Sequence, residues 1–136
     1  MPQVDFMILC DYVRADGGLL HMIAAGIDRI RVPMLPAVHN VGVAVRLSLH
    51  RSECDRDYEL QLIFQNTDGQ RIADLTAQFR AQYPPGLPAG WPTPVALALN
   101  LGLPLQAYGE YSFELLISGD HKKSLGVIVE PPPQGG

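Results

Sequence analysis

The chain has 136 residues, of which 47% are hydrophobic and 18% are charged, and its net charge is −4. This length suits a single domain, and the balance is that of a globular protein, because disorder needs low hydrophobicity and high net charge. Tight nucleic-acid binding needs clustered basic residues. The ten Lys and Arg residues are instead scattered, so we expect no nucleic-acid partner.

The first part of the chain alternates apolar and polar residues with a period of two, which is typical of strands. Runs at 4–13 and 19–32 flank Asp16-Gly17-Gly18, whose glycines supply the positive φ angles of a tight turn. Gly26 is expected to bend or bulge the second run. A third run, 41–49, carries its valines and leucines on one face, so that face is predicted to line the core.

Residues 58–64 and 71–83 flank Asn66-Thr67-Asp68-Gly69, a strong hairpin signal. The second arm also fits a helical stripe, but strand alternation fits better. One face carries Ala73, Leu75, Ala77, Phe79, Ala81 and Tyr83, and the other carries Asp74, Thr76, Gln78, Arg80 and Gln82. A slip of one residue would turn the polar face inward, so this pattern predicts its own pairing register.

Residues 84–94 form a loop rich in Pro and Gly that contains Trp91, and neither a helix nor a strand could run through it. The following run, 95–103, alternates large apolar residues with small ones. Its outward face is predicted to consist of Ala96, Ala98, Asn100 and Gly102. Such a face permits close approach of another sheet, either from a second copy in a homodimer or from another segment of this chain.

The stretch 105–117 places Leu105 six residues and Gly109 two residues before Tyr111, followed by alternating apolar residues. This pattern resembles the tyrosine corner of immunoglobulin-like sandwiches, in which the Tyr hydroxyl bonds to upstream backbone. Residues 118–120 turn the chain into a last strand at 123–130, and the Lys pair at its start is read as edge protection. The Pro- and Gly-rich tail, 131–136, is predicted to be flexible.

About eight strands, each with one apolar face, require two packed sheets. The predicted fold is therefore an all-β, immunoglobulin-like antiparallel sandwich that forms one domain over residues 1–130. A jelly roll with a similar strand count would produce the same alternation and is the alternative.

A search for metal ligands finds one concentration of suitable side chains, made of His39, His50, Cys54, Asp55 and Asp57. The spacing from His50 to Cys54 suits a helix better than a strand end, and no second ligand pair completes a set of four. We interpret these residues as solvated loop positions. No metal or other cofactor is predicted.

Nucleophilic catalysis needs a Ser, Thr or Cys beside a His that an acid orients. Cys10 precedes Asp11, and His21 lies across the first predicted hairpin. Cys10 shares a strand face with Phe6, which favours a packed and inert thiol. His21 alternates with leucine and isoleucine and is read as partly buried. No catalytic residues are assigned.

Other catalytic signals are weak. The acids Asp28, Asp74, Glu110 and Glu114 are spread over separate strands. The glycine motifs of nucleotide-binding loops and the nucleophile elbow of hydrolases are absent from the sequence. We therefore predict that the protein is not an enzyme.

The candidate binding residues are Trp91, Tyr83 and Asn100. Trp and Tyr supply large contact areas and dominate interface hot spots. The competing interpretation, which we favour, is that Trp91 folds back and caps one end of the sandwich. If a small ligand binds instead, Asn100, Tyr108 or His21 would supply the polar contacts of a pocket.

Two segments resemble a family of small bacterial proteins known only as a domain of unknown function. The first is 6–27, and the second is 105–129 with its Gly-Glu-Tyr-Ser-Phe-Glu-Leu and Gly-Asp-His-Lys-Lys-Ser-Leu stretches. The resemblance implies an immunoglobulin-like sandwich and assigns no catalytic or ligand-binding residue. Abundant Ala, Pro and Gly with Arg in excess of Lys fit a bacterial source with a GC-rich genome.

The start of the chain, Met-Pro-Gln-Val-Asp, lacks the basic and apolar regions of a signal peptide, and no run reaches the roughly 18 apolar residues of a membrane span. We therefore expect Cys10 and Cys54 to be reduced thiols in a cytoplasmic protein without a membrane partner. The predicted role is a protein-interaction module that self-associates or binds another protein through the Pro-rich loop or a sheet edge. The alternative is a small-molecule binder, and a hydrolase or metal-dependent enzyme is the third hypothesis.

Overall fold

The computed structural model describes residues 2–133, which form an all-β fold without an α-helix in that range. The strands are β1 (Gln3–Cys10), β2 (Tyr12–Asp16), β3 (Leu19–Ile23), β4 (Arg29–Arg31), β5 (Ala37–Leu49), β6 (Asp57–Asn66), β7 (Arg71–Arg80), β8 (Thr93–Leu105), β9 (Gly109–Ile117) and β10 (Asp120–Glu130). A short 3₁₀ helix, η1 (Arg51–Glu53), follows β5. The predicted all-β class is confirmed.

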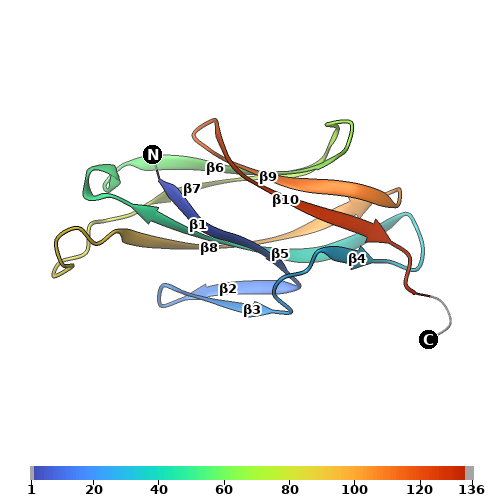
Figure 1. Cartoon of the computed structure of the whole chain (residues 1–136), viewed down its shortest axis with the longest axis horizontal. Helices are drawn as coiled ribbons and strands as arrows, with labels where there is room; N and C mark the ends of the chain where they lie inside the picture. Colours follow the sequence, from blue (N-terminus) through green and yellow to red (C-terminus); the bar gives the residue numbers. More distant parts are fainter. Residues whose placement is uncertain (1, 134–136) are drawn as a thin grey trace.

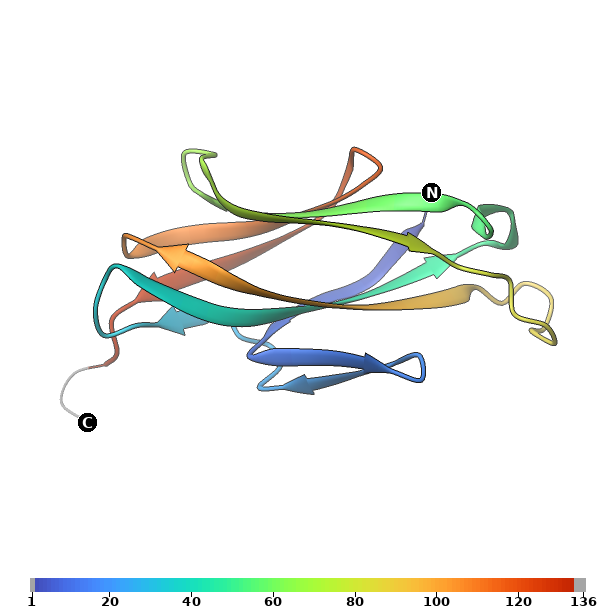
Figure 2. The ribbon, with the colours of Figure 1, turned by 180° about the vertical axis from the view of Figure 1, so that it is seen from behind.

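The strands form two larger sheets and one separate hairpin. The sheet orders are β1-β5-β8, β4-β10-β9-β6-β7 and β2-β3. Figures 1 and 2 show the five-stranded sheet curling over one side of the three-stranded sheet, with the β2–β3 hairpin on the opposite side. The purely antiparallel arrangement that we predicted is wrong at one point, because β4 runs parallel to β10.

Two of the predicted strands are each divided in the structure, so the estimate of about eight strands was too low. The run 4–13 breaks at Asp11, where β1 ends and the chain leaves the three-stranded sheet. The run 19–32 breaks between β3 and β4, where Ala24 and Gly26 have φ angles of 56° and 90°. Positive φ is incompatible with continued strand geometry, so the bend predicted at Gly26 is confirmed.

The main core lies between the facing surfaces of the two larger sheets. Phe64 at its centre has its ring centroid 5.0 Å from that of Tyr111 and 4.8 Å from that of Phe113. The valines and leucines predicted to face the core from 41–49 are all buried. Full burial of a side chain of this size contributes about 1.5–3 kcal/mol, so this interior is the main source of stability.

The tyrosine-corner contact predicted from the sequence is present. The hydroxyl of Tyr111 donates a hydrogen bond to the carbonyl of Ala107 at 2.6 Å, just before β9 begins. The neighbouring Tyr108 donates to the carbonyl of Val32 at 2.9 Å. Together these bonds fix the segment through which the chain passes from β8 in one sheet to β9 in the other.

The predicted β6–β7 hairpin is present, with Leu62 opposite Leu75 and Phe64 opposite Ala73, and its register shifts after Phe64. Asn66 organises the turn, since its side-chain oxygen accepts hydrogen bonds from the N–H groups of Asp68 and Gln70 at 3.0 Å. The second arm is a strand as predicted, but it ends at Arg80 and not at Tyr83.

After β10, residues 131–133 have no regular secondary structure, and the remainder of the predicted tail, 134–136, lies outside the described residues. Within 2–133, no helix is long and apolar enough to cross a membrane.

Candidate functional site

The β2–β3 hairpin is the part of the fold that neither larger sheet incorporates. Gly17 and Gly18, with φ angles of 61° and 77°, form the two-residue turn predicted from the sequence. Tyr12 lies opposite Ile23 and Arg14 lies opposite His21 in the register that this turn sets. The hairpin leaves the end of β1 and returns to it, because the N–H groups of Gly26 and Ile27 both bond to the carbonyl of Leu9.

One side chain attaches the hairpin to the three-stranded sheet. Asn100, on β8, accepts a hydrogen bond from the Val13 N–H through Oδ1 at 3.1 Å, and its Nδ2 donates to the Val13 carbonyl at 2.8 Å. The amide thereby pairs with β2 as a neighbouring strand would. Opposite Asn100 lies Gly42, where an added Cβ would be 2.9 Å from the Val13 nitrogen, so the close approach of the hairpin requires glycine.

A small second core seals the hairpin against the sheet. Its buried members are Cys10, Val13 and Ala44, and the partly buried Phe6, Leu20, Met22 and Ala98 pack around them. Of the small-residue face predicted for 95–103, Ala98 and Asn100 therefore meet another segment of the same chain, whereas Gly102 is exposed. Asn100, a candidate binding residue, uses its side chain to hold the hairpin on the three-stranded sheet.

Cys10 is enclosed in this second core, as predicted for a packed thiol. It is fully buried, and its Sγ–H donates to the carbonyl of Gly42 at 3.3 Å. Burial and the neighbouring Asp11 carboxylate raise the pKa of the Cys10 thiol. Because the thiolate is the reactive form, this environment keeps the sulfur unreactive.

The outer face of the hairpin is exposed and mixes apolar side chains with the polar side chains of Arg14, Asp16 and His21. Its large apolar side chains, Tyr12, Leu19 and Ile23, are 51%, 66% and 62% exposed. His21 lies on this same face and is exposed, so the prediction of a partly buried histidine is wrong. Every neighbour of His21 in β3 is apolar, and tertiary contacts bring Leu20 and Met22 to the sheet instead of Leu19 and Ile23.

The Pro-rich loop presents Trp91 to solvent. The side chain is 64% exposed, so the interpretation of Trp91 as a cap on the sandwich is wrong, although its backbone N–H does bond to the carbonyl of Pro88. Tyr83 is half-buried against the main core, and the guanidinium of Arg51 lies 4.8 Å from its ring centroid. The loop and the β2–β3 turn lie at the same end of the long axis in Figures 1 and 2.

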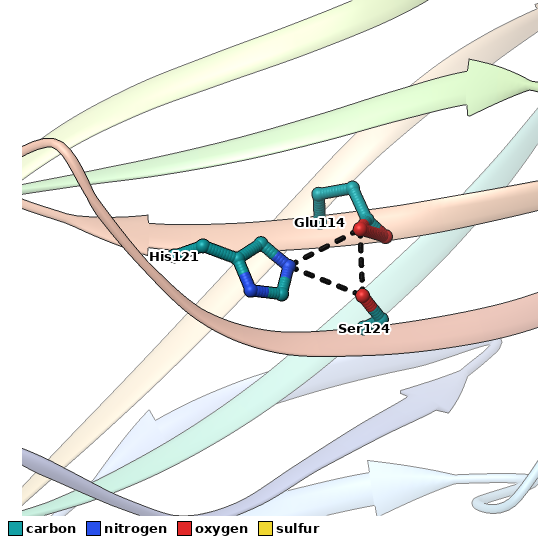
Figure 3. Close-up of polar contacts among 3 residues, drawn as sticks. All are labelled: Glu114, His121 and Ser124. Carbon is teal, nitrogen blue, oxygen red and sulfur yellow. Dashed lines mark hydrogen bonds and ion pairs between the residues drawn. The ribbon is translucent and has the colours of Figure 1, made fainter. Parts of the chain in front are cut away.

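A polar cluster that the sequence did not suggest lies on β9 and β10 (Figure 3). His121 Nε2 lies 3.1 Å from both Glu114 Oε1 and Ser124 Oγ, and the Ser124 hydroxyl donates to Glu114 Oε1 at 2.6 Å. A register shift in β10 between His121 and Lys123 makes this meeting possible. Nothing in the local alternation of residues signals such a shift.

This cluster lacks the arrangement that activates a serine. In a catalytic triad the acid orients one ring nitrogen of the histidine, while the other nitrogen takes the serine proton. Here a single nitrogen of His121 meets both partners, and the serine hydroxyl points to the glutamate. The arrangement is that of a hydrogen-bonded surface cluster between neighbouring strands.

The residues considered as metal ligands do not converge. Within residues 2–133, no group of three His, Cys, Asp or Glu side chains has a geometry that could hold a metal ion. Cys54 is buried, and its Sγ–H contacts Thr93 Oγ1 and the carbonyl of His50 at 3.5 Å, so the prediction that it is a solvated loop position is wrong.

One shallow hollow of about 400 Å³ lies over β9 and β10. Its lining includes Asp28, Arg29, Glu110 and Gly126. Two of the four scattered acids, Asp28 and Glu110, are thereby brought to one place. The side chains expected to supply a pocket with polar groups, Asn100, Tyr108 and His21, are not part of its lining.

Comparison with protein families gives one finding. Residues 5–130 match the model of a family described as "Family of unknown function (DUF6941)". A comparison with curated proteins finds no match. The family match covers all ten strands except the first two residues of β1, so it includes both larger sheets and the β2–β3 hairpin.

Proposed function

The chain belongs to this family of unknown function, and from that premise we propose that it is a non-enzymatic protein-interaction module that docks its partner on the β2–β3 hairpin. The observation that carries the proposal is the exposure of Tyr12, Leu19 and Ile23 on one face of an anchored hairpin, where they alternate with charged and polar side chains. Large apolar side chains held on a fixed backbone lose little entropy on binding, which favours affinity.

The anchoring of the hairpin supports a docking role over a role in the core. Its inner face and the Asn100 amide hold it in place, so the exposed side chains are not required for its attachment. Side chains that contribute little to folding can contact a partner without a cost in stability. The Pro-rich loop, which carries the exposed Trp91, lies at the same end of the long axis as the β2–β3 turn (Figures 1 and 2).

The non-enzymatic part of the proposal is supported by the geometry around His121. His121 has an acid and a serine beside it, but in an arrangement unsuited to proton transfer from the serine. A test that would overturn this part is hydrolysis of activated esters by the wild type that the Ser124→Ala variant loses.

We propose that the two larger sheets form an immunoglobulin-type sandwich. The order β1-β5-β8 corresponds to strands A, B and E of that fold, and the order β10-β9-β6-β7 corresponds to G, F, C and C′. The tyrosine corner at the start of β9 supports the assignment of β9 as strand F. In this scheme the β2–β3 hairpin is an insertion after strand A, and insertions in scaffolds commonly carry function.

A cytoplasmic location in a bacterium completes the proposal. Its support is that Cys10 and Cys54 are both unpaired and buried, as expected in a reducing compartment. Fractionation of the source cells tests the location. Recovery in an exported fraction would contradict it.

Affinity capture with matched variants tests the docking surface. The double variant Leu19→Lys/Ile23→Lys places charges on the outer face of the hairpin, and Val38→Lys is the control because Val38 is 73% exposed elsewhere. We expect a protein captured by the wild type and the control to be lost with the double variant, at unchanged thermal stability. Capture that survives the double variant but not Trp91→Ala would move the site to the Pro-rich loop and refute the hairpin.

The second candidate function is binding of a small molecule in the hollow beside Arg29 and Glu110. The mixture of an apolar floor and a few charged groups is the observation in its favour. Native mass spectrometry of the purified protein tests it. A retained mass beyond the 14.9 kDa chain, lost in an Arg29→Ala variant, would favour this candidate over the docking module.

A further inference from the structure

β3 differs from the other free strand edges of the fold. Natural sheets protect such edges with charged residues, proline or bulges. β4 and β7 carry arginines, β8 has a proline near each end, and β1 has Asp5 beside a register shift. Over residues 2–133, β3 is the edge strand that has none of these features, since its sequence is Leu-Leu-His-Met-Ile.

The two strands of the hairpin also differ from each other. In an antiparallel pair, residues alternate between bonding across the pair and pointing their N–H and C=O groups outward. The outward groups of Val13 in β2 are occupied by Asn100. Met22 lies opposite Val13, so by the same alternation the N–H and C=O of Met22 and of Leu20 point away from β2.

Among residues 2–133, these outward groups of β3 have no hydrogen-bond partner. No backbone or side-chain partner for the outward N–H and C=O of Leu20 and Met22 occurs within the described range. In both ribbon views β2 lies between the three-stranded sheet and β3, so the free edge of β3 faces away from the rest of the molecule (Figures 1 and 2).

The sequence of β3 is complementary to itself in the antiparallel direction. If His21 is placed opposite His21 of another copy, Leu20 lies opposite Met22 and Leu19 lies opposite Ile23. In this register the outward groups of Leu20 face those of Met22, which gives two hydrogen bonds on each side of the centre. Every other opposed pair is apolar, and no charged residue of β3 opposes another.

We propose that the protein forms a two-fold symmetric dimer in which the β3 strands of two copies pair antiparallel about His21. The result is a continuous four-stranded sheet, with strand order β2-β3-β3-β2, between two bodies. Identical surfaces meet across the axis, which is the commonest form of closed assembly. The inference rests on the proposed function and deepens it by naming the partner of the hairpin as a second copy of this chain.

The pairing of the two His21 side chains supplies a charge-exchange test. In this register the two His21 residues form a non-hydrogen-bonded pair, in which opposite Cα atoms lie about 4.5 Å apart. Like charges at these two positions repel, and opposite charges attract. His21 is exposed, and both His21→Lys and His21→Glu leave the hairpin anchor untouched. Sedimentation velocity from micromolar to millimolar concentration measures the association of each protein.

We expect the wild type to form dimers of the 14.9 kDa chain and each single variant to dimerise at least tenfold more weakly. An equimolar mixture of His21→Lys and His21→Glu should restore dimers. The control variants are Val38→Lys and Val38→Glu, because Val38 is 73% exposed and lies away from β3. Both should dimerise as the wild type does. In the wild-type dimer, amide exchange at Leu20 and Met22 should slow relative to dilute protein.

Two results would overturn the inference. One is a wild type that stays monomeric at millimolar concentration, and the other is a dimer that neither His21 variant weakens. A different result would refute the proposed function, namely that the Leu19→Lys/Ile23→Lys variant still captures every protein that the wild type captures. If the wild type is monomeric and the Leu19→Lys/Ile23→Lys variant loses the captured protein, the dimer is refuted and the docking proposal is supported.

Discussion

The hydrogen bonds between Asn100 and Val13 make a specific prediction about the Asn100→Ala variant. The substitution removes both bonds, one of 3.1 Å and one of 2.8 Å, that join β8 to β2. It leaves the Val13 N–H and carbonyl without their protein partner at a partly buried site. The hairpin should therefore detach more readily while the two larger sheets stay folded.

The magnitude follows from the number and setting of these bonds. A hydrogen bond contributes about 0.5–1.5 kcal/mol net, and a buried group left unpaired costs about 1–3 kcal/mol. Asn100 itself is exposed, so water can reach the Val13 N–H and carbonyl after the substitution. The loss for each bond is therefore the net value of about 0.5–1.5 kcal/mol. We expect a loss of about 2 kcal/mol, equivalent to an equilibrium constant for hairpin opening that is about 30-fold larger.

Hydrogen exchange of the β2–β3 amides measures that opening, and urea unfolding measures global stability. Asn40→Ala is the matched control, because Asn40 lies opposite Gly102 on the same sheet as the Asn100–Gly42 pair and does not bond to the hairpin. The control should change stability by no more than about 0.5 kcal/mol. Equal exchange rates in the two variants would refute the assignment of Asn100 as the hairpin anchor.

Three further predictions concern separate parts of the fold. Gly42→Ala should lower the free energy of unfolding by about 1–3 kcal/mol, because its Cβ would lie 2.9 Å from the Val13 nitrogen. Gly126→Ala is the control, since no atom lies within 4 Å of its Cβ, and equal urea midpoints for the two variants would contradict the prediction. Tyr111→Phe should cost about 1 kcal/mol in thermal or urea unfolding through loss of the 2.6 Å bond, and an unchanged stability would show that the tyrosine corner contributes nothing. The raised pKa of Cys10 predicts slow labelling by thiol reagents at neutral pH until the protein unfolds, and rapid labelling of the native protein would contradict its burial.

The elements that the sequence predicted correctly depend on local signals. The β6–β7 register follows from a short loop and from a polar face that cannot be turned inward, so neighbours in the chain settle it. The tyrosine corner likewise depends on Tyr111 and a carbonyl four residues away. The turn at Gly17-Gly18 requires positive φ angles that glycine adopts without strain.

The candidate site was only partly predictable. Residue type and position in the sequence pattern predict Trp91, Tyr83 and Asn100 as binding residues. The structure exposes Trp91, packs Tyr83 against the core and assigns Asn100 to the hairpin anchor. The exposed face of β3 was missed because all its residues except His21 are apolar, and a strand that is apolar on both faces carries no period-two signal.

What the sequence determined by itself was the all-β class, the turns and the inward faces of the long strands, because alternation and turn chemistry act between near neighbours. What only the tertiary structure decided was the attachment of the hairpin, since Val13 and Asn100 are 87 residues apart in the chain. It also decided which face of β3 is exposed and which strand edge is left open. These features depend on packing between distant segments, and the free energy of such contacts is not encoded in any local pattern.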